Sequence, residues 1–241
     1  MPSPHGSTFR NSSIFRRTDS TLRSSDLFFY DYQCTRYKIE QSAERLHQFI
    51  TQILMDRASI AGNGQPSYET VHLVGHSAGA VVIRQLLLEV VKRSKFSAFR
   101  DLLLESNPVL FGSAHSGFQH SMAVMLLLQR VPFLDVAVAA WLLTRGAVYP
   151  DLQHDSKALT SLEEQTKDLW HTATVPAFRP LLAWGQNEQV VNVVDYLRDI
   201  RIAYKAECDH FSICKPKRSD PDALRWISEA ITQVPANAAP R

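Results

Sequence analysis

Residues 69–89 read ETVHLVGHSAGAVVIRQLLLE, so a short apolar run, a tight turn and a long apolar segment follow one another directly. The run at 71–74 is apolar and contains β-branched residues, which is typical of a buried strand. The segment at 80–90 is free of Gly and Pro and predicts a buried helix. Between them lies the pentapeptide Gly-His-Ser-Ala-Gly. In this context it predicts a nucleophile elbow with Ser77 at its tip.

The residue types of this elbow have a steric reason. A side chain at Gly75 or Gly79 would collide with the neighbouring strand or helix, because the turn is tight. The turn lifts the hydroxyl of Ser77 above the edge of the sheet. It also directs the backbone N–H of Ala78, at the helix start, toward the place where an oxyanion would form. The alternative is a strand–helix turn without chemistry, and the flanking apolar segments favour the nucleophile.

The composition is that of a globular protein. Of 241 residues, 45% are hydrophobic and 21% are charged, which suits a single domain. The formal net charge of +2 is too small to indicate binding to nucleic acid or to an anionic membrane surface. The longest apolar stretch, at 122–143, is interrupted by polar residues and Pro, so we expect no membrane span.

The three cysteines, Cys34, Cys208 and Cys214, show neither metal-ligand spacing nor a paired framework. This usage fits a reducing compartment, and we expect a cytoplasmic protein without a metal or cofactor. The N-terminus has no apolar core, so no signal peptide is expected. Residues 1–25 are rich in Ser and Arg, as mitochondrial transit peptides are, which leaves a mitochondrial location as the alternative.

The same N-terminal segment carries His5-Gly6-Ser7. An H-G motif supplies the second oxyanion donor in esterases, where it follows a strand. Here only four residues precede it, too few for that strand, so we expect that the chain is either a truncated product or has its start elsewhere. Two interpretations of 1–25 stay open: a disordered tail, or the remnant of an oxyanion loop.

Predicted strands and helices alternate along the rest of the chain. We predict strands at 27–32, 71–74, 108–111, 175–184 and 200–205, and helices at 39–55, 80–90, 96–104, 151–170 and 222–234. This alternation predicts an α/β fold with a mostly parallel sheet and helices on both faces. In such sheets ligands bind beyond the carboxyl ends of the strands. Polar residues that follow different strands can therefore meet at one edge.

Three such residues form a candidate catalytic set. A serine hydroxyl needs an adjacent base, and His210, which follows the last predicted strand, is the candidate. Glu188, in the loop after the preceding strand, is the candidate acid that would orient the imidazole and stabilise its protonated form. The order Ser77, Glu188, His210 is nucleophile, acid, histidine, as in α/β-hydrolases.

Other histidines compete for the role of base. His115 is the main rival to His210, because its predicted strand neighbours the elbow strand. His72 lies in a strand and His76 within the elbow, so neither can easily swing over Ser77. His210 is favoured by its position between the last strand and the final helix.

Other carboxylates compete for the role of acid. Asp195 and Asp199 lie in a helix-like segment after Glu188. Asp209 adjoins the candidate base but is expected to face the other way. Glu188 lies three residues after Gly185 in a strand-end turn, which favours it over an ordinary loop carboxylate.

Four stretches carry a family resemblance: VHLVGHSAGAVV, LFGSAHSG, LLAWGQNEQVV and DHFSICKP. They resemble motifs of the α/β-hydrolase superfamily. They are most similar to its branch of serine esterases and lipase-like proteins, which includes the GPI-inositol-deacylase-like proteins. The resemblance extends over about 27–231. It implies an α/β-hydrolase fold, the site residues Ser77, Glu188 and His210, and an oxyanion hole formed by the amides of Ala78 and Ser7.

The domain organisation follows from this reading. We predict an α/β-hydrolase domain at 26–234 and a frayed tail at 235–241. Residues 118–149 are apolar and helical in pattern, and they lie where a hydrolase carries its helical cap or lid. Two interpretations stay open for them: a lid whose underside lines an acyl-binding pocket, or ordinary packing between helices.

The function expected from the sequence is hydrolysis of carboxylic esters, of a small molecule or a lipid, through an acyl-enzyme. No cofactor or metal is implied. A shortened and catalytically impaired protein that acts by binding is the first alternative. A thioesterase or amidase with the same triad is the second, since these differ only in the leaving group.

Overall fold

The structure is a computed structural model, and it describes residues 22, 25–31, 36–61, 68–92, 99–118, 146–172, 175–191, 201–205, 207–215 and 221–232. Within them, four parallel strands form one sheet in the order β1-β2-β3-β4. The strands are β1 (Val74–His76), β2 (Val109–Phe111), β3 (Leu181–Gly185) and β4 (Arg201–Lys205). Because all four strands are parallel, their carboxyl ends lie at the same edge of the sheet.

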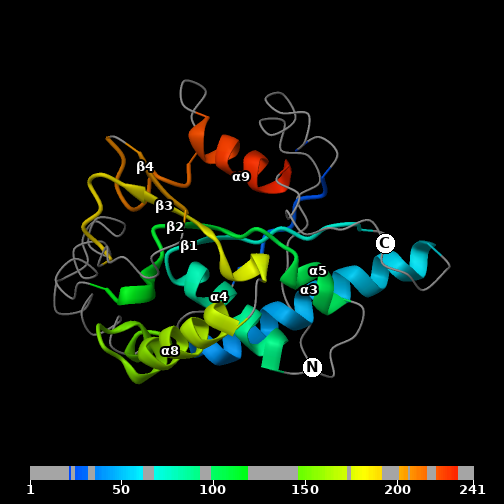
Figure 1. The fold of residues 1–241 in the computed structure, drawn as a ribbon, viewed down its shortest axis with the longest axis horizontal. Coiled ribbons are helices and arrows are strands. Elements are labelled where there is room, and N and C mark those ends of the chain that lie inside the picture. The colour runs from blue at the N-terminus through cyan, green and yellow to red at the C-terminus, as the bar shows by residue number, and fades with distance from the viewer. Residues whose placement is uncertain are drawn as a thin grey trace.

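Helices cover both faces of this sheet (Figure 1). On one face lie α3 (Ile39–Ala61), α4 (Ala78–Lys92), α5 (Phe99–Leu104) and α8 (Lys157–Thr172), and on the other lies α9 (Asp222–Thr232). The described part of the chain also contains three short 3-10 helices: η1 (Ala114–Ser116), η2 (Pro150–Leu152) and η3 (Pro176–Phe178). The predicted α/β architecture, a parallel sheet with helices on both faces, is confirmed.

The helix that follows the elbow is central to the core. Every residue from Ala80 to Leu88 is buried, which explains why this segment is mostly apolar rather than apolar on one stripe; Arg84 and Gln85 are its two buried polar residues. Neighbouring α3 buries a single stripe that faces this core, at Ile39, Ala43, Leu46, Ile50 and Leu54. On the opposite face, Trp226 of α9 packs against Phe111 of β2, with ring centroids 6.2 Å apart. The elements on either side of the elbow are therefore held in place by close packing in the core.

Several predicted boundaries are wrong. The elbow strand spans Val74–His76 rather than 71–74, because its register pairs Gly75 with Leu110 and His76 with Phe111. The segment at 175–184 divides into η3 and β3, since Pro176 is the first residue of the 3-10 helix and Pro180 directly precedes the strand.

The boundaries of two further predicted elements also differ. The helix predicted to begin at Asp151 begins at Lys157, where the hydroxyl of Ser156 accepts the N–H of Leu159 as a cap. The strand predicted at 27–32 is not formed over its described part, 27–31, which contains only a single bridge residue, Phe29.

Other predictions concern residues outside the described ranges. The segments 1–21 and 233–241 lie there, as does most of the predicted lid, at 119–145. The predicted domain boundaries therefore stay predictions. No helix within the described residues has both the length and the hydropathy needed to cross a membrane.

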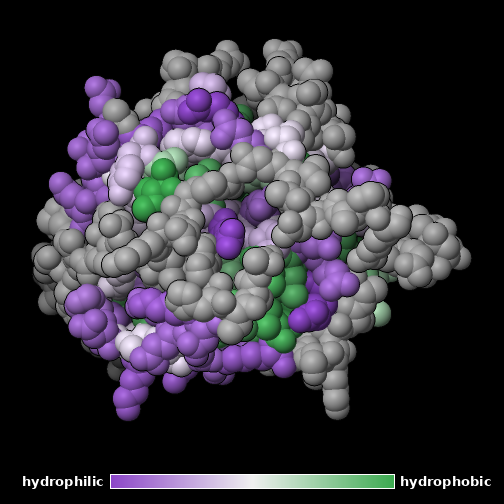
Figure 2. Space-filling view, viewed as in Figure 1, coloured by the Kyte–Doolittle hydropathy of each residue, from purple (hydrophilic) through white to green (hydrophobic). Residues whose placement is uncertain are grey.

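Among the residues coloured by hydropathy in Figure 2, most are hydrophilic, and hydrophobic residues gather in separate patches. The large hydrophobic side chains exposed in the described part of the chain are Phe28, Phe29, Met55, Val74, Ile202 and Tyr204. Exposed apolar side chains that lie singly or in small groups are normal for folded proteins.

Candidate active site

Ser77 lies in the turn between β1 and α4. Its φ is +56°, in the left-handed region that residues other than glycine rarely adopt. The turn is held from both sides, because the N–H of Ser77 donates to the carbonyl of Phe111 at 2.9 Å and the N–H of Ala80 donates to the carbonyl of Ser77 at 3.1 Å. A strained residue that its surroundings hold in place in this way is a common feature of active sites.

The glycine before this turn is required by packing. A β-carbon at Gly75 would lie 2.7 Å from Cδ1 of Ile83 and 2.9 Å from Cα of Ala80. Both neighbours belong to α4, so only a glycine lets the strand approach the helix this closely. The steric reason given for the elbow sequence therefore holds at Gly75.

His210 follows β4 and reaches back to the elbow. Its Nε2 lies 2.9 Å from Oγ of Ser77, and the residue is only 2% exposed. The turn that carries it is organised by Asp209, whose Oδ1 accepts the N–H of Phe211 and both the N–H and the hydroxyl of Ser212. These bonds also lower the pKa of Asp209, with the Ser212 hydroxyl as the main cause. The carboxylate of Asp209 is thus used by the turn.

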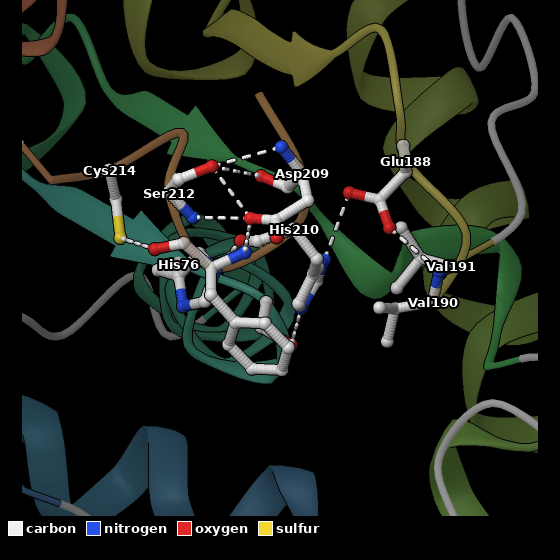
Figure 3. Close-up of polar contacts among 10 residues, drawn as sticks. His76, Glu188, Val190, Val191, Asp209, His210, Ser212 and Cys214 are labelled. Atoms are coloured by element: carbon white, nitrogen blue, oxygen red, sulfur yellow. Dashed lines mark hydrogen bonds and ion pairs between the residues drawn. The ribbon is translucent and has the colours of Figure 1, made fainter. Parts of the chain in front are cut away.

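Glu188 follows β3 and meets the other side of the same imidazole. Its Oε2 lies 3.0 Å from Nδ1 of His210, while its Oε1 accepts the N–H groups of Val190 and Val191 at 2.8 and 3.2 Å. Figure 3 shows Glu188 and His210 pointing toward one another. Burial raises the pKa of Glu188, but the hydrogen bond and charge of His210 and the two backbone N–H groups outweigh it, so the pKa lies below its ordinary value.

These contacts define the proton positions. A carboxylate only accepts hydrogen bonds, so Nδ1 of His210 carries the proton that is donated to Glu188. In the neutral ring, Nε2 is then the acceptor for the hydroxyl of Ser77. The arrangement can take a proton from the serine and stabilise the resulting imidazolium with a buried carboxylate.

The loops that carry the acid and the base are tied together by their backbones. The N–H of Asn187 donates to the carbonyl of Cys208 at 3.0 Å, and the N–H of Gln186 donates to the carbonyl of Lys205 at 2.9 Å. A β-carbon at Gly185 would overlap the carbonyl oxygen of Cys208. Glycine at this strand end therefore permits the approach that brings the two loops into contact.

His76 is not expected to act as the base because it cannot easily swing over Ser77, but it contacts the base in another way. Its Nε2 lies 2.7 Å from the backbone carbonyl oxygen of His210, and the two ring centroids are 4.8 Å apart. The sequence feature that could have indicated this contact is the position of His76, which directly precedes the nucleophile at the carboxyl end of a strand.

The structure places the remaining candidates elsewhere or does not describe them. His115, the rival base, is buried in η1 and packs edge-on against Trp184, with ring centroids 5.7 Å apart. Ala78, the expected oxyanion donor, is the first residue of α4, so its amide lies at a helix N-terminus. The rival acids Asp195 and Asp199 and the second expected oxyanion donor, Ser7, lie outside the described residues.

No group of three or more metal-ligating side chains is found in the described ranges that could hold a metal ion. No protein-family model matches the sequence, and no curated protein matches it either. Solved structures do match. The phospholipase PlaB from Legionella pneumophila, in complex with thio-NAD, matches with a TM-score of 0.54 and 14% identity, over 86% of this chain and 50% of that chain.

Two lipases also match. The mature form of lipase BlEst2 from Bacillus licheniformis has a TM-score of 0.47 and 15% identity, over 78% of this chain and 74% of that one. A monoacylglycerol lipase from Paleococcus ferrophilus has a TM-score of 0.40 and 16% identity, over 85% and 78%.

The sheet, its helices and the likeness to PlaB together define an α/β-hydrolase fold. At such low identity the likeness is one of fold, and the two lipases, with TM-scores below 0.5, add nothing to the argument. The chain spans about half the length of PlaB. What the fold is used for has to be argued from the site itself.

Proposed function

We propose that this protein is a serine hydrolase that cleaves carboxylic esters, with Ser77 as nucleophile, His210 as general base and Glu188 as the orienting acid. One observation carries the proposal. Oγ of Ser77, the imidazole of His210 and the carboxylate of Glu188 form a continuous chain of hydrogen bonds, 2.9 and 3.0 Å long, beside a strained strand–helix turn.

In the first half of the reaction, Oγ of Ser77 attacks the ester carbonyl while its proton passes to Nε2 of His210. The tetrahedral intermediate collapses, the bond to the alcohol breaks, and the imidazolium gives its proton to the departing alcohol oxygen. Glu188 stays ionised and stabilises the imidazolium. The products are a free alcohol and an acyl-enzyme on Ser77.

In the second half, water takes the place of the alcohol. Nε2 of His210 accepts a proton from the water as its oxygen attacks the acyl carbonyl, and the same proton returns to Oγ of Ser77 when the second intermediate collapses. The carboxylic acid leaves and the serine is restored. No oxidant, reductant or cofactor enters the balance.

The developing oxyanion needs donors. The amide of Ala78, at the N-terminus of α4, is our first candidate, because a helix start presents free N–H groups and a positive dipole end. The amide of Ser7 is the second, on the family resemblance of the His5-Gly6-Ser7 motif. One such donor contributes about 3 kcal/mol, or roughly 100- to 1,000-fold in rate.

The substrate class we favour is a small-molecule or lipid ester. The resemblance of the motifs to serine esterases and lipase-like proteins, including the GPI-inositol-deacylase-like branch, supports this choice. The fold shared with a phospholipase is in keeping with it. The same triad would also serve a thioester or amide, so a panel of leaving groups belongs in the test.

The decisive experiment is labelling with a fluorophosphonate probe, combined with hydrolysis of p-nitrophenyl butyrate. We expect the wild-type chain to be labelled and active, and the Ser77→Ala variant to be unlabelled and inactive while it retains its circular dichroism spectrum. Ser161→Ala, on the exposed side of α8, is the matched control and should behave as wild type. A wild-type chain that resists the probe, or labelling that persists in Ser77→Ala, would refute the proposal.

A further inference from the structure

The base is held by a group outside the triad. Nε2 of His76 lies 2.7 Å from the backbone carbonyl oxygen of His210, next to the nucleophile in sequence. We propose that His76 is a positioning residue, whose N–H holds the backbone of His210 so that the imidazole stays within hydrogen-bonding distance of Ser77. This inference rests on the proposed function, and it concerns how the base is kept in place.

Strand geometry directs His76 to this carbonyl. Successive side chains of a strand point to opposite faces, and the missing side chain of Gly75 would point into α4. His76 therefore points to the other face of the sheet, where the loop after β4 carries His210. In Figure 3 its ring lies beside this loop. The strand that precedes Ser77 thus also carries His76, which forms the hydrogen bond to the backbone of the base.

The bond has a defined direction. A carbonyl oxygen only accepts, so Nε2 of His76 must carry a proton and donate it. Burial and the neighbouring His210 lower the pKa of His76 to about 4, with a smaller lowering from Lys215 and opposing contributions from the His210 carbonyl and Glu188. His76 is therefore neutral near pH 7, with its proton on Nε2. It can hold the base without placing a second positive charge beside the imidazolium.

The hydrogen bond from His76 is one of two that hold backbone carbonyls of the loop that carries His210. The carbonyl of Cys208 is held by the N–H of Asn187, from the loop of the acid. The carbonyl of His210, two residues further on, is held by His76, from the strand of the nucleophile. These two hydrogen bonds connect the loop of His210 to the segment that carries Glu188 and to the strand that precedes Ser77. Only the second of these hydrogen bonds is made by a side chain, so it can be removed by a substitution that leaves the backbone N–H groups in place.

Two variants separate the hydrogen bond from simple packing. His76→Gln places an amide N–H close to the position of the imidazole Nε2–H, whereas His76→Met has a similar volume and no donor. A misplacement of a reacting group by about 1 Å can cost roughly 100-fold in rate. We therefore expect His76→Met to lower kcat and the fluorophosphonate labelling rate about 10- to 100-fold with KM nearly unchanged. His76→Gln should remain within about threefold of wild type.

A second measurement does not depend on activity. Hydrogen–deuterium exchange of the peptide that covers 207–215 should be faster in His76→Met than in wild type or His76→Gln. The proposed positioning is supported if kcat, labelling and exchange all follow this order.

Three results would overturn the inference. Wild-type kcat in His76→Met would leave the proposed hydrolase intact and remove the role of His76. Equal losses in both variants would show that ring packing, and not the donated proton, is what matters. Unchanged hydrogen–deuterium exchange in His76→Met would overturn the positioning role of His76, whether or not the protein is active. A wild-type protein that resists the probe would count only against the proposed function.

Discussion

Gly112 lies directly against the imidazole of His210. A β-carbon at this position would be 3.0 Å from Nδ1 and 3.2 Å from Cε1 of His210, and 3.4 Å from Oε2 of Glu188. Its φ of +47° is also in the region that favours glycine. Gly112 follows β2, between the strands that carry the nucleophile and the acid. It leaves the space in which the hydrogen bond between His210 and Glu188 can form.

Replacing this glycine should therefore disturb catalysis as well as stability. In Gly112→Ala, the new methyl group displaces the imidazole from Ser77, and the positive φ adds strain of about 1–2 kcal/mol. We expect kcat for p-nitrophenyl butyrate to fall at least 10-fold, measured at a temperature where the variant is fully folded.

Gly117→Ala is the control for backbone strain. Gly117 also has a positive φ, +86°, and its β-carbon would meet the backbone of His154 at 2.7 Å. We expect this variant to unfold at lower temperature while kcat per folded molecule falls less than in Gly112→Ala. Equal losses of kcat per folded molecule in the two variants would argue against a specific contact with the imidazole.

Gly112 illustrates what sequence reasoning could not reach. The positions of Ser77, Glu188 and His210, each after a predicted strand, indicate a shared site, and the parallel sheet brings their side chains into hydrogen-bonding contact. The groups that surround them follow no such rule. The need for glycine at 112 comes from a side chain almost a hundred positions away, which no local pattern encodes.

The predicted boundaries of the elbow strand were wrong for a related reason. The run at 71–74 has the residue types of a strand, yet the ladder forms at Val74–His76 because that register pairs with β2. Glycine is unfavourable inside a strand, but here the close approach of α4 requires it. The end of the strand lies two residues further on than predicted, so His76 belongs to the strand, and this position explains its contact with His210. Tertiary pairing thus overrode local propensity at the functional site.

The charge of Glu188 should be essential to the reaction. In Glu188→Gln, Oε1 can still accept the N–H groups of Val190 and Val191, but the amide NH₂ then faces Nδ1 of His210. That contact favours the tautomer with its proton on Nε2, which cannot accept the proton of Ser77. We expect kcat to fall about 10⁴-fold, by analogy with the equivalent change in serine proteases.

The control for this change is Glu163→Gln, which removes a carboxylate from α8 that pairs with Lys167 at the surface. An exposed pair of this kind contributes little, so kcat should be unchanged. Steady-state kinetics of both variants provide the comparison. If Glu188→Gln kept more than a tenth of the wild-type kcat, an ionised acid would not be needed and the assignment of Glu188 would be wrong.

Stability should depend on pH through His76. In the folded protein its pKa is lowered from 6.5 to about 4, whereas in the unfolded chain it takes up a proton near pH 6.5. Unfolding therefore binds a proton between these values, and the free energy of unfolding falls as the pH is lowered through this window. The sign is opposite to that of a histidine stabilised as a cation. Above about pH 6.5 the contribution is complete.

Urea unfolding at pH 7 and at pH 4.5 tests this linkage. Since one pKa unit corresponds to about 1.4 kcal/mol, the wild-type chain should lose roughly 2 kcal/mol more between the two pH values than His76→Gln, which has no titrating ring. Other titrating groups are common to both proteins and cancel in the difference. Equal losses would show that His76 is not held in its neutral form by the fold.

The second oxyanion donor can be tested although it is a backbone group. Proline has no N–H, so Ser7→Pro removes the amide that the His5-Gly6-Ser7 motif is predicted to supply, whereas Ser7→Ala retains it and removes only the hydroxyl. If that amide binds the oxyanion, kcat should fall roughly 100- to 1,000-fold in Ser7→Pro and stay close to wild type in Ser7→Ala. KM should change little, because the interaction forms mainly in the transition state. Equal activity of the two variants would mean that the oxyanion relies on Ala78 and on a donor from elsewhere, and 1–25 would then be better described as a tail.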